Sequence, residues 1–329
     1  MHKLARRSTA FALLALASGL ASELHAAPAP ATALSAAPAA AAPVMAPTAT
    51  VAPPPAPLQA SLPAPARLPS FADFARAVLI AFDTHAPAAQ KKQALATLRD
   101  MAQDGNREAQ FAMGSLYMWG PRHPAALTPR DDAKAAIYLS NAAIQGNTDA
   151  MAAMAEIELR THHAVSALVW ALADYYFREH GPHKPHSYTA GLILRTREGL
   201  TAAQRQQAIT DANGFIARYG AGILAPRPGF APEPAACRIK ETFRPWVYFA
   251  DPAEGMPHGG VGWYLYAVDA KGRPLQHVAI NEFPSWRLRH TFALNVHKMR
   301  FSPAPACPKP VRYALVPFHF NSRHYRFNH

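Results

Sequence analysis

The chain has 329 residues, and 33 Lys and Arg against 21 Asp and Glu give it a net charge of +12 at neutral pH. It contains 16 histidines but only 2 cysteines, and it has no His-Glu-x-x-His or Cys-x-x-Cys motif, which argues against the common zinc sites. Serine nucleophile elbows, phosphate-binding glycine loops and dinucleotide fingerprints are missing as well. We therefore expect a protein that is not an enzyme and that uses no cofactor and no metal.

The first 26 residues have the three-part pattern of a secretory signal peptide. Arg6 and Arg7 precede an apolar run at 9–22, and small residues follow around Ala27. A bilayer-spanning helix needs about 20 apolar residues, and this run is shorter. We expect cleavage near Ala27 and a periplasmic location; an uncleaved anchor in the inner membrane, with the rest on the periplasmic side, is the alternative.

Residues 27–70 consist almost entirely of Ala and Pro, and Arg67 is the only charged residue among them. Proline fixes φ and removes an amide donor, so this segment should be an extended linker. It is either a spacer with no binding role or a tether that lets the folded part reach across the periplasm from an anchored N-terminus.

The stretch from 71 to 220 favours helices and contains a repeat. The sequence GNREAQFAMG at 105–114 is echoed 41 residues later by GNTDAMAAMA at 146–155. Gly105 and Gly146 should be turn residues at helix ends, and Ala135 should lie at a close helix contact. Thr201 and Gln204 form the pattern of a capping box, which predicts a last helix up to about Tyr219.

The spacing of this repeat, together with the phrase DDAKAAIYLSNAAIQGN at 131–147, resembles the Sel-one-like repeat family, a relative of tetratricopeptide repeats. The resemblance implies an α-solenoid of helix pairs that serves as a binding scaffold. A short array of this kind could equally be only a rigid mount for the C-terminal part.

The segment 262–320 favours strands as well as a helix, unlike the helical stretch before it. Strand-forming runs flank Gly272, where a tight hairpin needs positive φ, and Asp269 should accept backbone amide protons in that turn. Four apolar residues then recur with a helical period, which predicts a helix whose apolar face covers one side of the sheet. A final apolar run follows and predicts the last strand. These four residues are Leu288, Phe292, Val296 and Met299. The predicted order is β-β-α-β.

The hairpin VDAKGRP, the helix ending in MRFSPA and the final strand LVPFHF together resemble the TonB C-terminal domain family. The resemblance implies a small periplasmic α+β domain that receives a short peptide from an outer-membrane transporter along an exposed sheet edge.

The final strand, 311–320, has no successor and precedes a polar, basic tail, so it is a candidate edge for an added peptide strand. Phe318 and Phe320 should face the core. Alternatively the strand lies inside the sheet, or a dimer partner or the strand at 262–268 covers its edge. The expected peptide-binding edge comprises Val311, Tyr313, Leu315, Pro317, His319 and Asn321.

Cys237 and Cys307 bracket the β-rich region. In an exported chain such a pair is expected to form a disulfide. Closing a loop of about 70 residues would stabilise the fold by roughly 4 kcal/mol.

The chain is thus predicted to be a mixed multidomain protein, α + α/β, in which α-solenoid helix pairs precede a small β-β-α-β domain. Its expected parts are a signal peptide (1–26), a disordered Ala/Pro-rich linker (27–70), Sel-one-like helical repeats (71–220), a second linker (221–236) and a TonB C-terminal-like domain (237–329).

The leading functional hypothesis is a non-enzymatic periplasmic adaptor that binds proteins through its repeats and an extended peptide through its C-terminal domain. From Cys237 onward there are 13 Lys and Arg against 5 Asp and Glu. This excess favours a periplasmic or outer-membrane protein segment, or an anionic envelope component such as peptidoglycan, as the partner rather than nucleic acid. It could equally be the general basicity of exported proteins. The alternative function is an inner-membrane-anchored energy transducer of the TonB type for outer-membrane transport.

Overall fold

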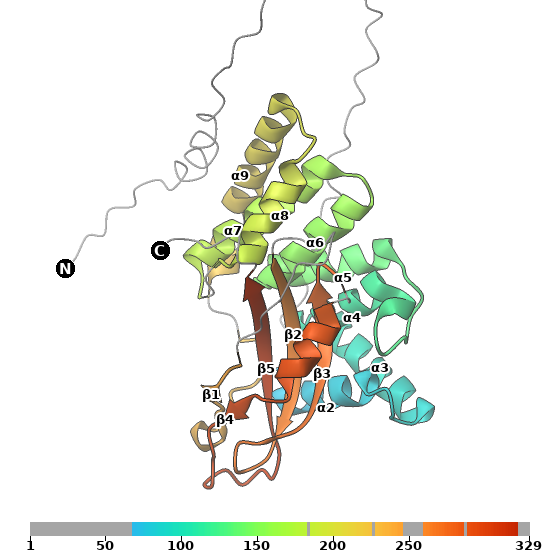
Figure 1. Cartoon of the computed structure of the whole chain (residues 1–329), viewed down its shortest axis with the longest axis vertical. Coiled ribbons are helices and arrows are strands. Elements are labelled where there is room, and N and C mark those ends of the chain that lie inside the picture. Colours follow the sequence, from blue (N-terminus) through green and yellow to red (C-terminus); the bar gives the residue numbers. More distant parts are fainter. Residues whose placement is uncertain (1–67, 183–184, 226–227, 246–258, 286–287, 322–329) are drawn as a thin grey trace, which may run out of the picture. The chain divides into compact units, whose positions relative to one another are not determined.

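The structure is a computed structural model, and it describes residues 68–182, 185–225, 228–245, 259–285 and 288–321 (Figure 1). The expected signal peptide, nearly all of the Ala/Pro-rich linker and the tail after 321 lie outside these residues. Helices form the first part of the described chain and antiparallel strands form the last, as the sequence predicts.

Helices α4 and α6 confirm the repeat, because they start 41 residues apart with the same cap. The side-chain oxygen of Asn106 accepts a hydrogen bond from the Ala109 amide, and that of Asn147 accepts one from Ala150, which satisfies the first free amides of each helix. The preceding Gly105 and Gly146 have φ values of +88° and +94°, so they are the expected turn residues. In chain order the helices before the sheet are α2 (Phe71–Phe82), α3 (Ala88–Gln103), α4 (Arg107–Trp119), α5 (Asp132–Ile144), α6 (Thr148–Arg160), α7 (Ala164–His180), α8 (Ser187–Arg197) and α9 (Ala202–Leu224).

Small residues lie where neighbouring helices meet, and aromatic rings fill the wider gaps. Ala135 on α5 is fully buried, and the rings of Tyr117 and Tyr138 stack with centroids 5.9 Å apart. Thr201 and Gln204 form the predicted capping box at the start of α9. This helix does not end near Tyr219 as predicted but continues to Leu224. The buried Gly220 does not stop it, since a single glycine weakens a helix without ending it.

The main sheet has three antiparallel strands in the order β3-β2-β5: β3 (Pro274–Phe283), β2 (Gly259–Val268) and β5 (Arg312–Asn321). In the turn between β2 and β3, Gly272 has a φ of +83° and the Asp269 carboxylate accepts the amide of Arg273 at 2.8 Å. Helix α10 (Leu288–Val296) follows and buries Leu288, Phe292 and Val296. It ends before Met299, which is buried as well but lies outside the helix whose face it was predicted to share. Within the main sheet, the predicted order β-β-α-β is confirmed.

Two further strands were not predicted, because each is too short to show an alternating pattern. They are β1 (Glu241–Phe243) and β4 (Arg300–Phe301), which pair with each other.

Both faces of the sheet are covered. On one face, Tyr264, Tyr266 and Phe318 form a core with α10. On the other face, Leu265 and Ile280 belong to one continuous core with the preceding helices. Of these helices, α2, α4 and α8 contact the strands. The sequence predicts only the α10 side of this arrangement. The polar contacts that fix the second side join residues far apart in the chain.

Candidate functional site

Strand β5 ends the described sheet, since it pairs with β2 alone. The pairing runs without a bulge from Gly259 opposite Asn321 to Val268 opposite Arg312. In such a ladder the N–H and C=O of one residue point to the same side, and the side alternates along the strand. Half of the β5 residues therefore direct their backbone groups away from β2.

Arg244 identifies which half points outward. Its Nη1 donates a hydrogen bond to the carbonyl oxygen of Pro317 at 2.9 Å, so Pro317 faces away from β2. By alternation Tyr313 and Leu315 point their backbone groups outward too. These residues belong to the set expected from the sequence.

The outward edge is open in one stretch and closed in another. No partner contacts the outward N–H and C=O of Tyr313 and Leu315 within the residues that the structure describes. At Pro317 the amide proton is missing and the carbonyl is already bonded to Arg244. Proline at an edge of this kind prevents further strand pairing.

The open stretch lies in a groove of about 380 Å³. Val311 and the first half of β5, up to Val316, form its floor, and the start of α2 lies on one side with Phe71. The segment 237–241 lies on the other side, where Ile239 and Phe301 supply apolar surface. Since Tyr313 and Leu315 pack with the helical core while Ile239 and Phe301 pack with the α10 core, the groove straddles the edge of the sheet.

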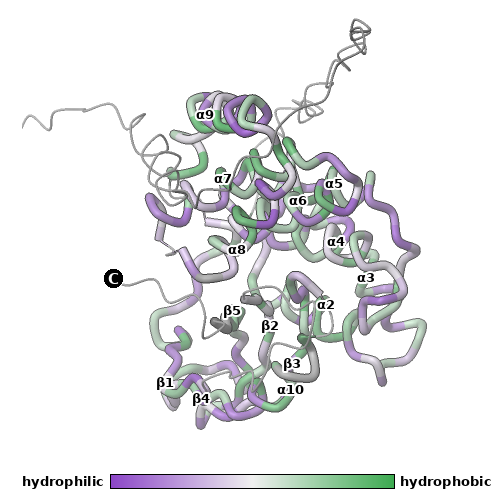
Figure 2. The backbone as a smooth tube through the Cα atoms, turned by 45° about the horizontal axis from the view of Figure 1, so that its top comes forward, coloured by the Kyte–Doolittle hydropathy of each residue, from purple (hydrophilic) through white to green (hydrophobic). Residues whose placement is uncertain are grey.

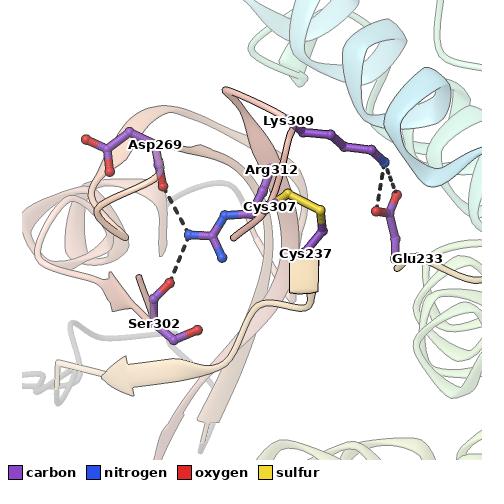
Figure 3. Close-up of a disulfide and its surroundings, with 7 residues drawn as sticks. All are labelled: Glu233, Cys237, Asp269, Ser302, Cys307, Lys309 and Arg312. Atoms are coloured by element: carbon purple, nitrogen blue, oxygen red, sulfur yellow. Dashed lines mark hydrogen bonds and ion pairs between the residues drawn. A yellow bond between two sulfur atoms is a disulfide. The ribbon is translucent and has the colours of Figure 1, made fainter. Parts of the chain in front are cut away.

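A disulfide fastens the second wall of this groove (Figure 3). Cys237 and Cys307 are bonded with a Cα–Cα distance of 4.8 Å, as the sequence predicts. An ion pair lies beside it, in which the Lys309 ammonium donates to both oxygens of Glu233 at 3.0 and 2.8 Å. A partly exposed pair of this kind contributes little stability, so of these two links the disulfide fixes the wall more strongly.

Arg312 at the start of β5 was not singled out from the sequence. Its side chain is only 3% exposed, and its Nη2 donates to the carbonyl oxygens of Asp269 and Ser302 at 3.0 and 2.8 Å (Figure 3). Arg312 therefore ties the β2–β3 turn and the chain after β4 to β5. No short pattern in the sequence marks such a long-range backbone anchor.

The six predicted edge residues differ in their surroundings. Val311 directly precedes β5, while Tyr313 and Leu315 lie in the groove. Pro317 lies beyond the groove and is bonded to Arg244. His319 and Asn321 lie opposite Val261 and Gly259 in the ladder, but their side chains, like that of Phe320, lie outside the described part. Phe318 is buried as predicted.

The helices also contain a buried charged cluster that was not predicted from the sequence. Arg178 donates to Asp149 and Asp174 at 2.7 Å each, and all three side chains are buried. Burial raises the pKa of Asp174 to about 6, although the charge of Arg178 opposes the shift. Because these groups bond to one another and do not line the groove beside β5, they support a structural role.

No family model, no curated protein and no solved structure matches this chain. In the described ranges, no group of three or more His, Cys, Asp or Glu side chains is placed to hold a metal ion, and none of the helices there is long and apolar enough to cross a membrane.

Proposed function

We propose that this chain is a non-enzymatic adaptor of the cell envelope that captures an extended peptide as an added strand beside β5. The observation that carries the proposal is that Tyr313 and Leu315 direct free backbone groups into an apolar-walled groove. An added strand gains affinity from main-chain hydrogen bonds and specificity from pockets for alternate side chains.

The two walls fit the geometry of a strand. Successive side chains of an extended peptide point to opposite faces. One set would contact Phe71 on the α2 side, and the other would contact Ile239 and Phe301 on the α10 side. The captured segment is therefore expected to carry apolar side chains on both of its faces and no proline where Tyr313 and Leu315 need a donor.

In this proposal the helices are Sel-one-like pairs and the sheet is TonB C-terminal-like, as the sequence resemblances imply. The helices pack on the face of the sheet opposite α10. There Asn281 on β3 donates to the Ser115 hydroxyl on α4 at 2.6 Å, and the His123 ring is hydrogen-bonded to the Ile280 carbonyl. These contacts support the role of a rigid mount. The docking of a second partner on the helices stays a prediction.

The proposed location is the periplasm. The disulfide suits an oxidising compartment, and the captured peptide would come from a periplasmic or outer-membrane protein, with peptidoglycan or another anionic component as a further partner. The energy-transducer alternative requires residues 1–26 to remain as an anchor. Sequencing the N-terminus of protein from fractionated cells distinguishes the two, because the adaptor should start near Ala27 and be released with the periplasm.

The test of peptide capture is a selection of displayed random peptides on the purified chain. Selected peptides are then made with single N-methyl groups along the backbone. Strand addition predicts that N-methylation blocks binding at every second position only, because only alternate amides face β5. Leu315→Pro removes an outward donor at an edge that already tolerates proline, so it should abolish binding with little change in melting temperature. Uniform sensitivity to N-methylation, or full binding by Leu315→Pro, would contradict the proposal.

A further inference from the structure

Five exposed cations surround β1, β4 and the β2–β3 turn. None of them forms an ion pair within the part of the chain that the structure describes; the nearby carboxylates of Glu241 and Asp269 are already paired, with Arg244 and Arg273. The five residues are Arg238, Lys240, Lys271, Lys298 and Arg300. Their charge is therefore available to an outside partner.

Backbone contacts bring these residues to one surface, here called the cationic surface. Arg300 lies opposite Phe243 in the β1–β4 pair, and Lys240 exchanges hydrogen bonds with Ser302 at 2.8 and 3.1 Å. The Phe301 amide donates to Gly272 at 3.0 Å, which places the turn that carries Lys271 beside β4. Figure 2 shows hydrophilic segments around β1 and β4.

The cationic surface also has a shallow depression and exposed apolar side chains. Arg238 and Lys240 line an open depression of about 530 Å³ together with residues 302–306. Phe243, in register with Arg300, is 52% exposed, and Leu294, four residues before Lys298, is 57% exposed. Phe243 is thus exposed beside the unpaired Arg300, and Leu294 is exposed on the helix that ends just before Lys298.

We propose that the cationic surface binds the headgroups of an anionic phospholipid bilayer. Lys and Arg near such a surface are attracted by its negative potential, while aromatic and leucine side chains enter the boundary between headgroups and acyl chains. An anionic polysaccharide would use the cations but would leave Phe243 and Leu294 in water. The combination of both residue types therefore favours a lipid surface over a polymer.

The test is sedimentation of the full chain with vesicles of phosphatidylcholine alone, or of equal parts phosphatidylcholine and phosphatidylglycerol. Binding is expected only to the anionic vesicles, and it should weaken as salt is added. The double variant Lys240→Ala/Arg300→Ala should lose roughly 25-fold in vesicle affinity, about fivefold for each cation. Arg238 stays in place because it also lines the β5 groove.

Two further variants make the test specific. Lys271→Ala/Lys298→Ala should cause a loss of similar size without touching the hydrogen bonds of β1 and β4. Lys92→Ala/Arg99→Ala, which removes two exposed cations from α3, should bind vesicles like the unmodified chain. Equal losses in all three variants would indicate general charge attraction and overturn the proposal. Binding to purified peptidoglycan but not to vesicles would overturn it in favour of a polymer. Peptide selection on these variants should be unchanged, so this result is independent of the proposed capture at β5.

Discussion

The indole Nε1 of Trp119 donates a hydrogen bond to the side-chain oxygen of Asn281 at 2.6 Å, across 162 residues of sequence. It joins α4 to β3 inside the buried contact between the helices and the sheet. A bulge in the β2–β3 ladder falls at this point, between the pairs Trp263–Asn281 and Tyr264–Ala279. Bulges redirect side chains, and at this bulge the side chain of Asn281 points toward α4.

The first prediction is that Trp119→Phe lowers the free energy of unfolding by about 0.5–1.5 kcal/mol, because the side-chain oxygen of Asn281 loses one of its two donors among the described residues and keeps the Glu282 amide. Denaturant unfolding measures the change. Trp263→Phe is the matched control, since the Trp263 indole N–H is buried with no hydrogen-bond partner among the described residues. Equal losses in the two variants would mean that ring size, and not the hydrogen bond, sets the cost.

The second prediction concerns the close contact of α4 and α5. A Cβ added at Gly114 would lie 2.6 Å from Cγ of the buried Leu139, so Gly114→Ala should cost about 1–3 kcal/mol through overpacking. Ala135→Leu, at the same contact, should cost a similar amount. Gly214→Ala on α9 is the control, because nothing lies within 4 Å of its added Cβ and it should stabilise by roughly 0.5–1 kcal/mol. Thermal unfolding distinguishes them, and a stable Gly114→Ala protein would contradict the packing described.

Local chemistry explains what the sequence predicts correctly. Gly272 must adopt positive φ in a tight turn, and Leu288, Phe292 and Val296 can share a face only in a helix, so both elements follow from a few neighbouring residues. The same holds for Thr201 with Gln204 and for the disulfide partners.

The rest of the fold and most of the site depend on contacts between distant residues. Trp119 with Asn281, Arg312 with Ser302, and Arg244 with Pro317 each join separate elements. Neither a period nor a cap marks such pairs. The sequence therefore predicts β5 as a candidate edge, but not the groove walls or the closed stretch at Pro317.

The third prediction is that Cys237→Ser/Cys307→Ser lowers the free energy of unfolding by roughly 4 kcal/mol, because the 70-residue separation is no longer constrained in the unfolded chain. Reduction of the unmodified chain should reproduce the loss, whereas reductant should leave the variant unchanged. Peptide mapping without reductant should recover the two cysteines in one linked fragment. Two free thiols in freshly isolated protein would contradict the structure.

The fourth prediction concerns pH. Burial raises the pKa of Asp174 from 3.8 to about 6, so the folded chain holds this proton after the unfolded chain has released it. The contribution of Asp174 to the free energy of unfolding should therefore fall as the pH rises from about 4 to about 6 and stay low above that range. Asp174→Asn cannot titrate. The difference in unfolding free energy between the two proteins should change with pH in this window, and a constant difference would contradict the raised pKa.

The last prediction is that the closed stretch of β5 can be opened. Pro317→Ala would add an outward N–H, and Arg244→Ala would release the carbonyl oxygen that Arg244 now holds at 2.9 Å. Each new hydrogen bond to a captured peptide is worth about 1 kcal/mol, so each change should tighten the binding of a selected peptide about fivefold, and the double variant by more than either alone. Arg76→Ala, which removes an exposed cation on α2, serves as the control and should leave affinity unchanged. Because an open edge can also pair with a second copy, affinity and oligomeric state should be measured on the same samples. Unchanged peptide affinity in a monomeric double variant would mean that the captured segment does not extend along the strand toward Pro317.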